Sequence, residues 1–264
     1  MPFTPELEHL IRRCDSHVGF AQLVQQREVK DQLQRVLLEY RNREKLERHG
    51  MSYRRKILLA GPPGTGKTMT ASILATELKL PLYRVQLDKV VTKFMGETSA
   101  KLRLVFEEMR ERKGVYLFDE FDTIGGERSS DNDVGEMRRV LNSFLQFIEN
   151  DPSDSLIVCA TNNPSLLDQA LFRRFDDVLV YAIPDAEGAR ELMRNRTAAF
   201  IDSSFDFDKV IGSVGEMSHA DITRACDDAI KLAILGDSKY LAEELLKSAL
   251  EKRKSVRKFI LTRV

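Results

Sequence analysis

One loop in the sequence combines glycines with a lysine and a threonine at a spacing that suits phosphate binding. The run from Gly61 to Thr68 fits the pattern Gly-x4-Gly-Lys-[Ser/Thr]. Glycines let such a loop wrap around phosphates with its N–H groups aimed inward, and the following helix adds the positive end of its dipole. We expect Lys67 to contact the β- and γ-phosphates of a nucleotide and Thr68 to bind Mg²⁺. The predicted nucleotide-contacting residues here are Gly61, Pro62, Pro63, Gly64, Thr65, Gly66, Lys67, Thr68 and Met69.

Two adjacent carboxylates, Asp119 and Glu120, follow the apolar run 115–118. A run of this kind predicts a buried strand, which delivers the residues after it to the sheet edge where the phosphate loop lies. There Asp119 can hold Mg²⁺ through water, and Glu120 can polarise an attacking water molecule. Together with the phosphate loop, the pair indicates attack of water on the terminal phosphate of a nucleotide. Transfer of the phosphoryl group to another acceptor would need an acceptor site, which the sequence does not offer.

The elements that must position these residues alternate along the chain. Short apolar runs predict strands, and helical spacings of apolar residues predict helices between them. This alternation predicts the α/β class, with a parallel five-stranded sheet and helices on both faces. The predicted strands cover residues 57–60, 82–87, 115–118, 155–160 and 177–183, and the predicted helices 27–48, 67–78, 99–112, 134–149 and 166–171.

The pattern changes after Pro184, where helical spacings continue over 186–199, 220–234 and 239–254 without a predicted strand. We therefore predict three parts. They are a helical lead-in over residues 1–50, an α/β nucleotide-binding domain over 51–184 and a small helical lid domain over 185–264. The basic tail over 251–258 is interpreted as a solvated helix end.

The composition is that of a soluble globular protein. The 264 residues include 41 basic and 41 acidic side chains, and 42% are hydrophobic, which excludes a disordered chain. The zero net charge removes a general argument for nucleic acid as partner. Three distant cysteines fit no disulfide framework and favour a reducing compartment. Without a signal peptide or an apolar run near the roughly 20 residues of a membrane helix, we predict a cytoplasmic protein with no membrane contact.

The motifs resemble those of the AAA ATPases, ring-forming motors that remodel proteins. The resemblance covers roughly residues 20–250 and rests on the phosphate loop and on the run 118–122, Phe-Asp-Glu-Phe-Asp. It implies the P-loop NTPase fold with a helical lid, and a nucleotide between the two. It also implies ATP and Mg²⁺ as cofactors, and a homo-oligomeric ring of six subunits.

The resemblance extends to residues that would complete the catalytic site. Asn162 lies in a segment similar to the family's sensor, where it would hydrogen-bond the attacking water or the γ-phosphate. The stretch 167–176 resembles the one that carries arginine fingers, which reach the neighbouring subunit's γ-phosphate. In the commoner pattern two residues separate the fingers, whereas Arg173 and Arg174 are adjacent here. The sequence leaves open which of the two contacts the nucleotide.

Two segments resemble those that bind the nucleotide base. Relatives carry Asp-x-x-Gly near the adenine, but the matching span 22–25 lacks both residues. Base recognition would then rest on backbone contacts and on the apolar Leu23 and Val24. In the lid, His219 replaces the glycine of a Ser-Gly-Ala-Asp segment, next to Ala220. The choice of ATP over GTP rests on the resemblance alone.

The segment after the second predicted strand matches the position of the family's pore loop, which grips substrate. The resemblance implies that aromatic and apolar side chains there hold an extended polypeptide, and Met is flexible enough for this. An alternative is a nucleic-acid or clamp-loader-like ATPase, which would need several basic residues in its channel loops. The two basic residues of these loops are outnumbered by four carboxylates, which disfavours that alternative. The predicted pore-loop residues are Lys93, Phe94, Met95 and Gly96.

The motifs do not indicate which substrate the protein acts on. Relatives usually carry an adaptor domain before the motor, and residues 1–25 are too few for one. Either the chain is trimmed, or a separate adaptor or protease partner selects the substrate. The compact spacing around the two arginines is most similar to that of bacterial stand-alone members with a single module.

Overall fold

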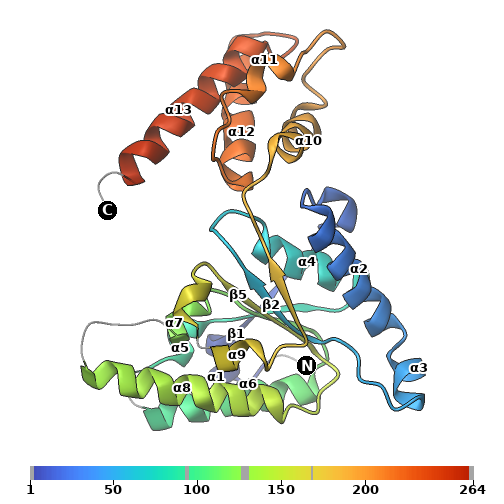
Figure 1. The fold of residues 1–264 in the computed structure, drawn as a ribbon, viewed down its shortest axis with the longest axis vertical. Helices are drawn as coiled ribbons and strands as arrows, with labels where there is room; N and C mark the ends of the chain where they lie inside the picture. The colour runs from blue at the N-terminus through green and yellow to red at the C-terminus, as the bar shows by residue number, and fades with distance from the viewer. Residues whose placement is uncertain (1–2, 93–94, 126–130, 168, 262–264) are drawn as a thin grey trace. The chain divides into compact units, whose positions relative to one another are not determined.

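The computed structural model describes residues 3–92, 95–125, 131–167 and 169–261 (Figure 1). The chain divides into two compact units. The first takes the residues up to Leu23, together with Arg27–Gly61 and Lys67–Tyr181. The second takes Val24–Gln26, Pro62–Gly66 and the residues from Ala182 onward. The central part of the phosphate loop therefore belongs to the second unit, and its two ends belong to the first.

The first unit contains a sheet of six strands in the order β1-β3-β4-β5-β2-β6. All neighbours in it run parallel except β1, which is antiparallel to β3. The predicted α/β class, with a largely parallel sheet and a C-terminal helical region, is therefore confirmed. The strands are β1 (Ile11–Cys14), β2 (Lys56–Ala60), β3 (Leu82–Val85), β4 (Val115–Phe118), β5 (Leu156–Thr161) and β6 (Asp177–Val180).

The prediction of five strands was wrong by one, because β1 lies inside the predicted helical lead-in over residues 1–50. It pairs with β3 at the edge of the sheet, with Ile11 opposite Val85. Of the four residues Ile-Arg-Arg-Cys, Ile11 alone is fully buried. An edge strand this short shows neither a continuous apolar run nor a clear alternation, so its sequence pattern does not reveal it.

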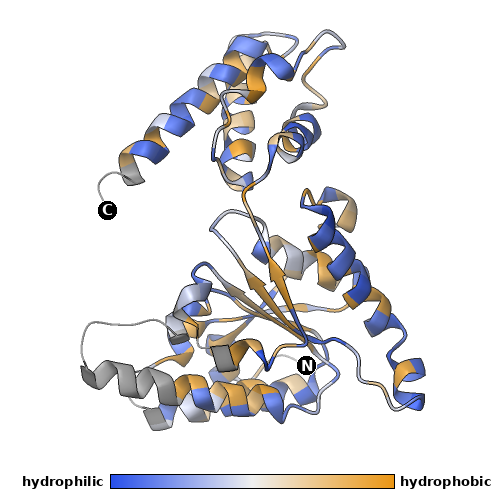
Figure 2. Ribbon diagram, viewed as in Figure 1, coloured by the Kyte–Doolittle hydropathy of each residue, from blue (hydrophilic) through white to orange (hydrophobic). Residues whose placement is uncertain are grey.

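Helices cover both faces of the sheet (Figure 1). Successive strand residues point to opposite faces, so that Ile57 packs with α2 and α4 while Leu58 packs with α1, α6 and α8. The strands β4 and β5 are buried along their whole length, and the middle of the sheet is coloured mostly hydrophobic in Figure 2, which is typical of parallel strands covered on both sides. The helices named here are α1 (Pro5–Leu10), α2 (Arg27–Arg41), α4 (Lys67–Leu78), α6 (Met95–Glu111) and α8 (Asp131–Glu149).

Short helices complete the first unit. The helix predicted over 27–48 is divided at Asn42 into α2 and α3. Asn is a weak helix former because its side chain competes for backbone hydrogen bonds, and its amide donates to the carbonyl of Leu38. The short helices are α3 (Arg43–Arg48), α5 (Leu87–Val90), α7 (Asp122–Gly125) and α9 (Gln169–Phe172), with 3-10 turns at Phe20–Gln22 and Pro164–Leu166.

The second unit is helical in the part that the structure describes, and its core lies between α10, α12 and α13. A capping box begins α12: the Ser218 hydroxyl accepts the N–H of Asp221, whose carboxylate accepts the N–H of Ser218. Among the described residues, no helix combines the length and apolar character needed to span a membrane. The helices are α10 (Ala186–Thr197), α11 (Asp208–Ile211), α12 (His219–Leu235) and α13 (Glu243–Leu261).

Candidate functional site

Three neighbouring strands of the first unit deliver predicted site residues to one edge of the sheet. In the parallel register, Ala60 of β2 lies opposite Thr161 of β5, and Cys159 of β5 lies opposite Phe118 of β4. Gly61, Asp119 and Asn162 directly follow these strands. The strand register therefore brings the phosphate loop, the acidic pair and Asn162 to one edge of the sheet.

The phosphate loop requires glycine at its first position. The φ angle of Gly61 is +152°, and a Cβ atom there would lie 2.2 Å from the carbonyl oxygen of Tyr181. Gly64 and Gly66 also have positive φ angles, of +75° and +97°. Any other residue would be strained in these conformations, so the backbone of the loop explains its glycine content.

Hydrogen bonds within the second unit hold the middle of the loop. The Gln25 side-chain amide donates to the carbonyl of Thr65 at 2.5 Å, and the Ala220 N–H donates to the carbonyl of Gly64 at 3.0 Å. A carbonyl oxygen that pointed into the loop would repel a phosphate. These two bonds engage the carbonyl oxygens of Thr65 and Gly64 with protein donors instead. Gln25 belongs to the span that the sequence analysis matched to the base-binding segment, but it was not predicted as a site residue.

The Lys67 ammonium is 6% exposed and donates to the carbonyl of Gly61 at 2.7 Å. Burial lowers its pKa, while the nearby carboxylates of Asp119 and Asp122 act in the opposite direction. A phosphate oxygen is a stronger acceptor than a peptide carbonyl, because its hydrogen bond is assisted by charge. The lysine is therefore placed to exchange its carbonyl partner for a phosphate.

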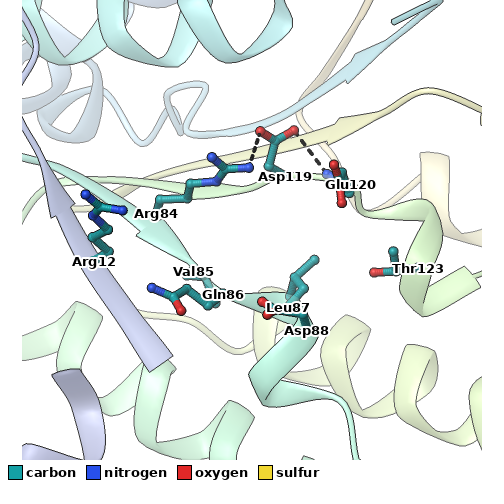
Figure 3. Close-up of a pocket in the computed structure, with 9 residues that line it drawn as sticks. All are labelled: Arg12, Arg84, Val85, Gln86, Leu87, Asp88, Asp119, Glu120 and Thr123. Atoms are coloured by element: carbon teal, nitrogen blue, oxygen red, sulfur yellow. Dashed lines mark hydrogen bonds and ion pairs between the residues drawn. The ribbon is translucent and has the colours of Figure 1, made fainter. Parts of the chain in front are cut away.

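Asp119 is the most highly connected carboxylate of the site. Its Oδ1 accepts the N–H of Glu120 at 3.0 Å. Its Oδ2 accepts the Thr68 hydroxyl at 3.0 Å and lies 3.2 Å from the guanidinium of Arg84 (Figure 3). Hydroxyl and carboxylate oxygens are ligands that Mg²⁺ prefers, so this donor set fits the ion that the sequence predicted.

Glu120 adopts a left-handed backbone conformation with φ of +54°. Such a conformation is uncommon for a residue other than glycine and often marks a functional position. The next residue, Phe121, is buried and donates its N–H to the carbonyl of Ala160 at 2.8 Å, which holds the turn to the end of β5. The Glu120 side chain stays exposed and lines a cavity of about 290 Å³ (Figure 3).

Asp122 connects the acidic segment to the segment of Asn162. Its Oδ1 accepts the Thr161 hydroxyl at 3.2 Å and the N–H of Asn162 at 3.3 Å. These bonds hold the backbone of Asn162 while its side chain remains exposed. Asp122 is the last residue of the run Phe-Asp-Glu-Phe-Asp and was not predicted as a site residue. Its place two residues after Glu120 is the sequence signal for this role.

Of the four residues predicted to bind the base, Leu23, Val24 and His219 are buried, and Ala220 is half-buried. Leu23 packs in the core against α2 and α4, whereas Val24 belongs to the second unit. The His219 ring is 9% exposed, with its Nε2 3.2 Å from the amide nitrogen of Gln25. Because that amide nitrogen can only donate, His219 Nε2 acts as acceptor and the ring is neutral. Burial lowers the pKa of His219, and the nearby backbone of Val24 partly opposes this shift.

We expect acid to destabilise the protein in part through His219. The pKa of this ring is lower in the folded chain than the value of about 6.5 in an unfolded one, so the unfolded chain binds more protons and stability falls as the pH drops below that value. Thermal melts between pH 8 and pH 5 should therefore show a smaller fall in Tm for His219→Gln than for the wild type. The exposed His49→Gln variant is the control and should follow the wild type. Equal falls in all three proteins would contradict the assignment.

The two adjacent arginines differ in their contacts. Both are exposed in the turn after α9. Arg174 forms an ion pair with Glu149, the last residue of α8, whereas Arg173 has no hydrogen bond or ion pair with any residue that the structure describes. The ion pair therefore distinguishes two side chains that the sequence left equivalent.

The predicted pore loop falls largely outside the described residues. Lys93 and Phe94 belong to the part that is not described, as does the side chain of Met95. Gly96 lies exposed in the first turn of α6.

Arg84 was not predicted as a site residue. The sequence feature that marks it is a charged residue between the apolar Tyr83 and Val85 of a strand.

Comparison with known proteins identifies relatives over most of the chain. Residues 57–182 match the family model of the ATPase family associated with various cellular activities (AAA). An uncharacterized AAA family ATPase of Sinorhizobium fredii is 38% identical over 221 residues, which cover 82% of this chain and 67% of that protein. An ATP-dependent zinc metalloprotease FtsH of Methylacidiphilum infernorum is 32% identical and a proteasome-activating nucleotidase of Methanococcus vannielii is 33% identical. The matches cover 89% and 85% of this chain but 38% and 57% of those two proteins.

A solved structure supports the fold. The crystal structure of the FIGL-1 AAA domain superposes with a TM-score of 0.71, covering 91% of this chain and 85% of that domain. Its sequence identity of 22% limits the comparison to the fold. The strand order and the C-terminal helices are thus those of a known architecture.

Proposed function

The chain belongs to the AAA family of ATPases, and from that premise we propose that it forms a ring that hydrolyses Mg²⁺-bound ATP to remodel, unfold or translocate polypeptides. The observation that carries the ATPase part is the convergence of the phosphate loop, Asp119-Glu120 and Asn162 at one sheet edge. At this edge Glu120 is exposed, Lys67 is buried, and Asp119 is held by the Thr68 hydroxyl and the N–H of Glu120. This arrangement suits attack of water on a terminal phosphate.

Binding of ATP would use residues of the loop and of α4. The backbone of the phosphate loop surrounds the phosphates, and Lys67 leaves the carbonyl of Gly61 to donate to them. Thr68 and Asp119 would hold Mg²⁺, the aspartate through water. When bound, the ion supplies positive charge that offsets the charge developing on the phosphates. The side chains of Leu23 and Val24 and the segment of His219 and Ala220 are proposed to contribute to base binding.

The chemical step would be carried by side chains at the ends of β4 and β5. Glu120 orients a water molecule and accepts its proton as the oxygen bonds to the γ-phosphorus and the bond to the ADP oxygen breaks. Asn162 hydrogen-bonds the same water or the γ-phosphate. An arginine of a neighbouring subunit stabilises the charge of the transition state, which makes the oligomer a requirement for turnover.

The polypeptide part of the proposal rests on the pore-loop motif and on the named relatives. One relative is a metalloprotease and another activates the proteasome, and both names connect ATP use to polypeptides. Phe94 and Met95 would grip the substrate. The chain spans only part of the length of these two relatives. As a further part of the proposal, an adaptor or a protease acts as partner of the ring.

The test is binding of a fluorescent unfolded polypeptide, labelled casein, in the presence of ATP. We expect Phe94→Ala to weaken casein binding at least tenfold, because an apolar contact repeated around a ring is lost from every subunit. Binding of a fluorescent ATP analogue should stay at the wild-type level. Leu38→Ala, which truncates an exposed apolar side chain on α2, is the matched control and should bind casein normally.

Two outcomes would contradict the proposal. Unchanged casein binding by Phe94→Ala would remove the pore loop from substrate binding. ATP-dependent binding of a labelled oligonucleotide in place of casein would favour the nucleic-acid alternative. Lys67→Ala serves as the negative control, since it should lose the ATP analogue and with it any ATP-dependent substrate binding.

A further inference from the structure

Arg84 makes an ion pair with the carboxylate that is proposed to hold Mg²⁺ (Figure 3). We propose that Arg84 competes with Mg²⁺ for Asp119 and thereby sets the Mg²⁺ concentration at which the protein binds its nucleotide. This inference rests on the proposed function, because it concerns the metal of that same site. It assigns a positioning role to a residue of β3, outside the motifs.

The strand register brings Arg84 to this position. On β3, Arg84 lies opposite Leu117 of β4, and Asp119 follows two residues later. The Arg84 side chain is 46% exposed, whereas that of Asp119 is 14% exposed. The carboxylate is therefore largely withdrawn from water, and the guanidinium of Arg84 compensates its charge at 3.2 Å.

The two partners of Asp119 Oδ2 differ in their compatibility with a metal. The Thr68 hydroxyl donates its proton to this oxygen at 3.0 Å and keeps lone pairs for Mg²⁺. Arg84 has no acceptor, so it can only occupy the oxygen and repel a second cation. The other oxygen, Oδ1, is used by the N–H of Glu120. A water ligand of Mg²⁺ that bonds to Oδ2 would therefore have to share or displace the contact with Arg84.

The surroundings of Arg84 favour this competition. Arg12 of β1 lies directly opposite Arg84 in the antiparallel register. The two guanidinium groups carry like charges, so Arg12 offers Arg84 no partner that competes with Asp119. Both arginines line the cavity of about 290 Å³ together with Asp88. This carboxylate in the same cavity gives Arg84 an alternative anionic neighbour when it leaves Asp119 (Figure 3).

The experiment measures binding of a fluorescent ADP analogue while Mg²⁺ is titrated into protein first treated with EDTA. For Arg84→Gln we expect the half-saturating Mg²⁺ concentration to fall by roughly threefold to tenfold, the range for loss of one partly exposed charged contact. Arg12→Gln is the matched control, because it removes a charge from the same cavity without touching Asp119. It should stay within about twofold of the wild type. Arg84→Lys keeps the charge and should also stay within about twofold.

An unchanged or higher half-saturating Mg²⁺ concentration in Arg84→Gln would overturn the inference, and a higher one would mean that Arg84 supports the metal site. If Arg84→Lys lowered the half-saturating Mg²⁺ concentration as much as Arg84→Gln does, the positive charge of residue 84 would not be what competes with Mg²⁺. Thermal melts verify that the variants are folded. A wild-type protein that binds no nucleotide at any Mg²⁺ concentration would instead contradict the proposed function, so the two failures are distinguishable.

Discussion

Replacing Glu120 with glutamine is expected to slow ATP hydrolysis by about two to four orders of magnitude while ATP binding is retained. Glutamine has the same shape but cannot accept the proton of the attacking water. The backbone contacts of this turn do not involve the altered group: the N–H of residue 120 still donates to Asp119, and Phe121 still donates to Ala160. The left-handed backbone is equally strained with either side chain, so we expect no change in Tm.

Phosphate release measures turnover, and a fluorescent ATP analogue measures binding. Asp88→Asn is the matched control, because Asp88 lines the same cavity as Glu120 and the change removes the same charge. Its hydrolysis rate should stay within about threefold of the wild type, as expected for an exposed charge outside the reaction. Normal turnover by Glu120→Gln would exclude Glu120 as the base. A comparable loss in Asp88→Asn would indicate a general effect of charge in the cavity.

The second large effect is expected for Arg173→Ala, which should reduce hydrolysis by about three orders of magnitude or more, as is typical of a lost arginine finger. Arg174 is engaged by Glu149 of its own chain, whereas Arg173 has no bond with the described residues, so Arg173 is available to a neighbour. Arg174→Ala should cost less than about tenfold, since it removes an exposed ion pair. A larger loss for Arg174→Ala than for Arg173→Ala would reverse the assignment.

A mixing experiment tests whether this arginine acts across subunits. Arg173→Ala subunits keep a complete phosphate loop, and Lys67→Ala subunits keep the finger. In mixed rings an intact finger can meet an intact loop, so activity should partly return when two inactive proteins are combined. Combining Arg173→Ala with a double variant that lacks both Lys67 and Arg173 is the control and should remain inactive. Absence of any recovery in the first mixture would contradict action in trans.

Much of the fold was predictable because the relevant signals are local. The helix predicted over 67–78 is α4 with the same bounds, and the strand predicted over 115–118 is β4. The helix begins at the end of the phosphate-loop motif, and the strand is a continuous apolar run that ends at the acidic pair, so contiguous residues mark both elements. The strand β1 was missed for the opposite reason, since four residues with two arginines carry no period and depend on β3 for their structure.

The residues of the site also divide into those that local sequence reveals and those that depend on distant segments. The sequence alone determined the phosphate loop and the acidic pair, because glycines in left-handed conformations and carboxylates after a buried strand are properties of contiguous residues. The tertiary structure decided which side chains those groups meet: Arg84 on Asp119, Gln25 beside His219, and Glu149 on Arg174. These partners are far apart in the chain and meet only through strand register and packing. No local pattern encodes such pairings, because they arise when the sheet and its helices have already brought distant segments together.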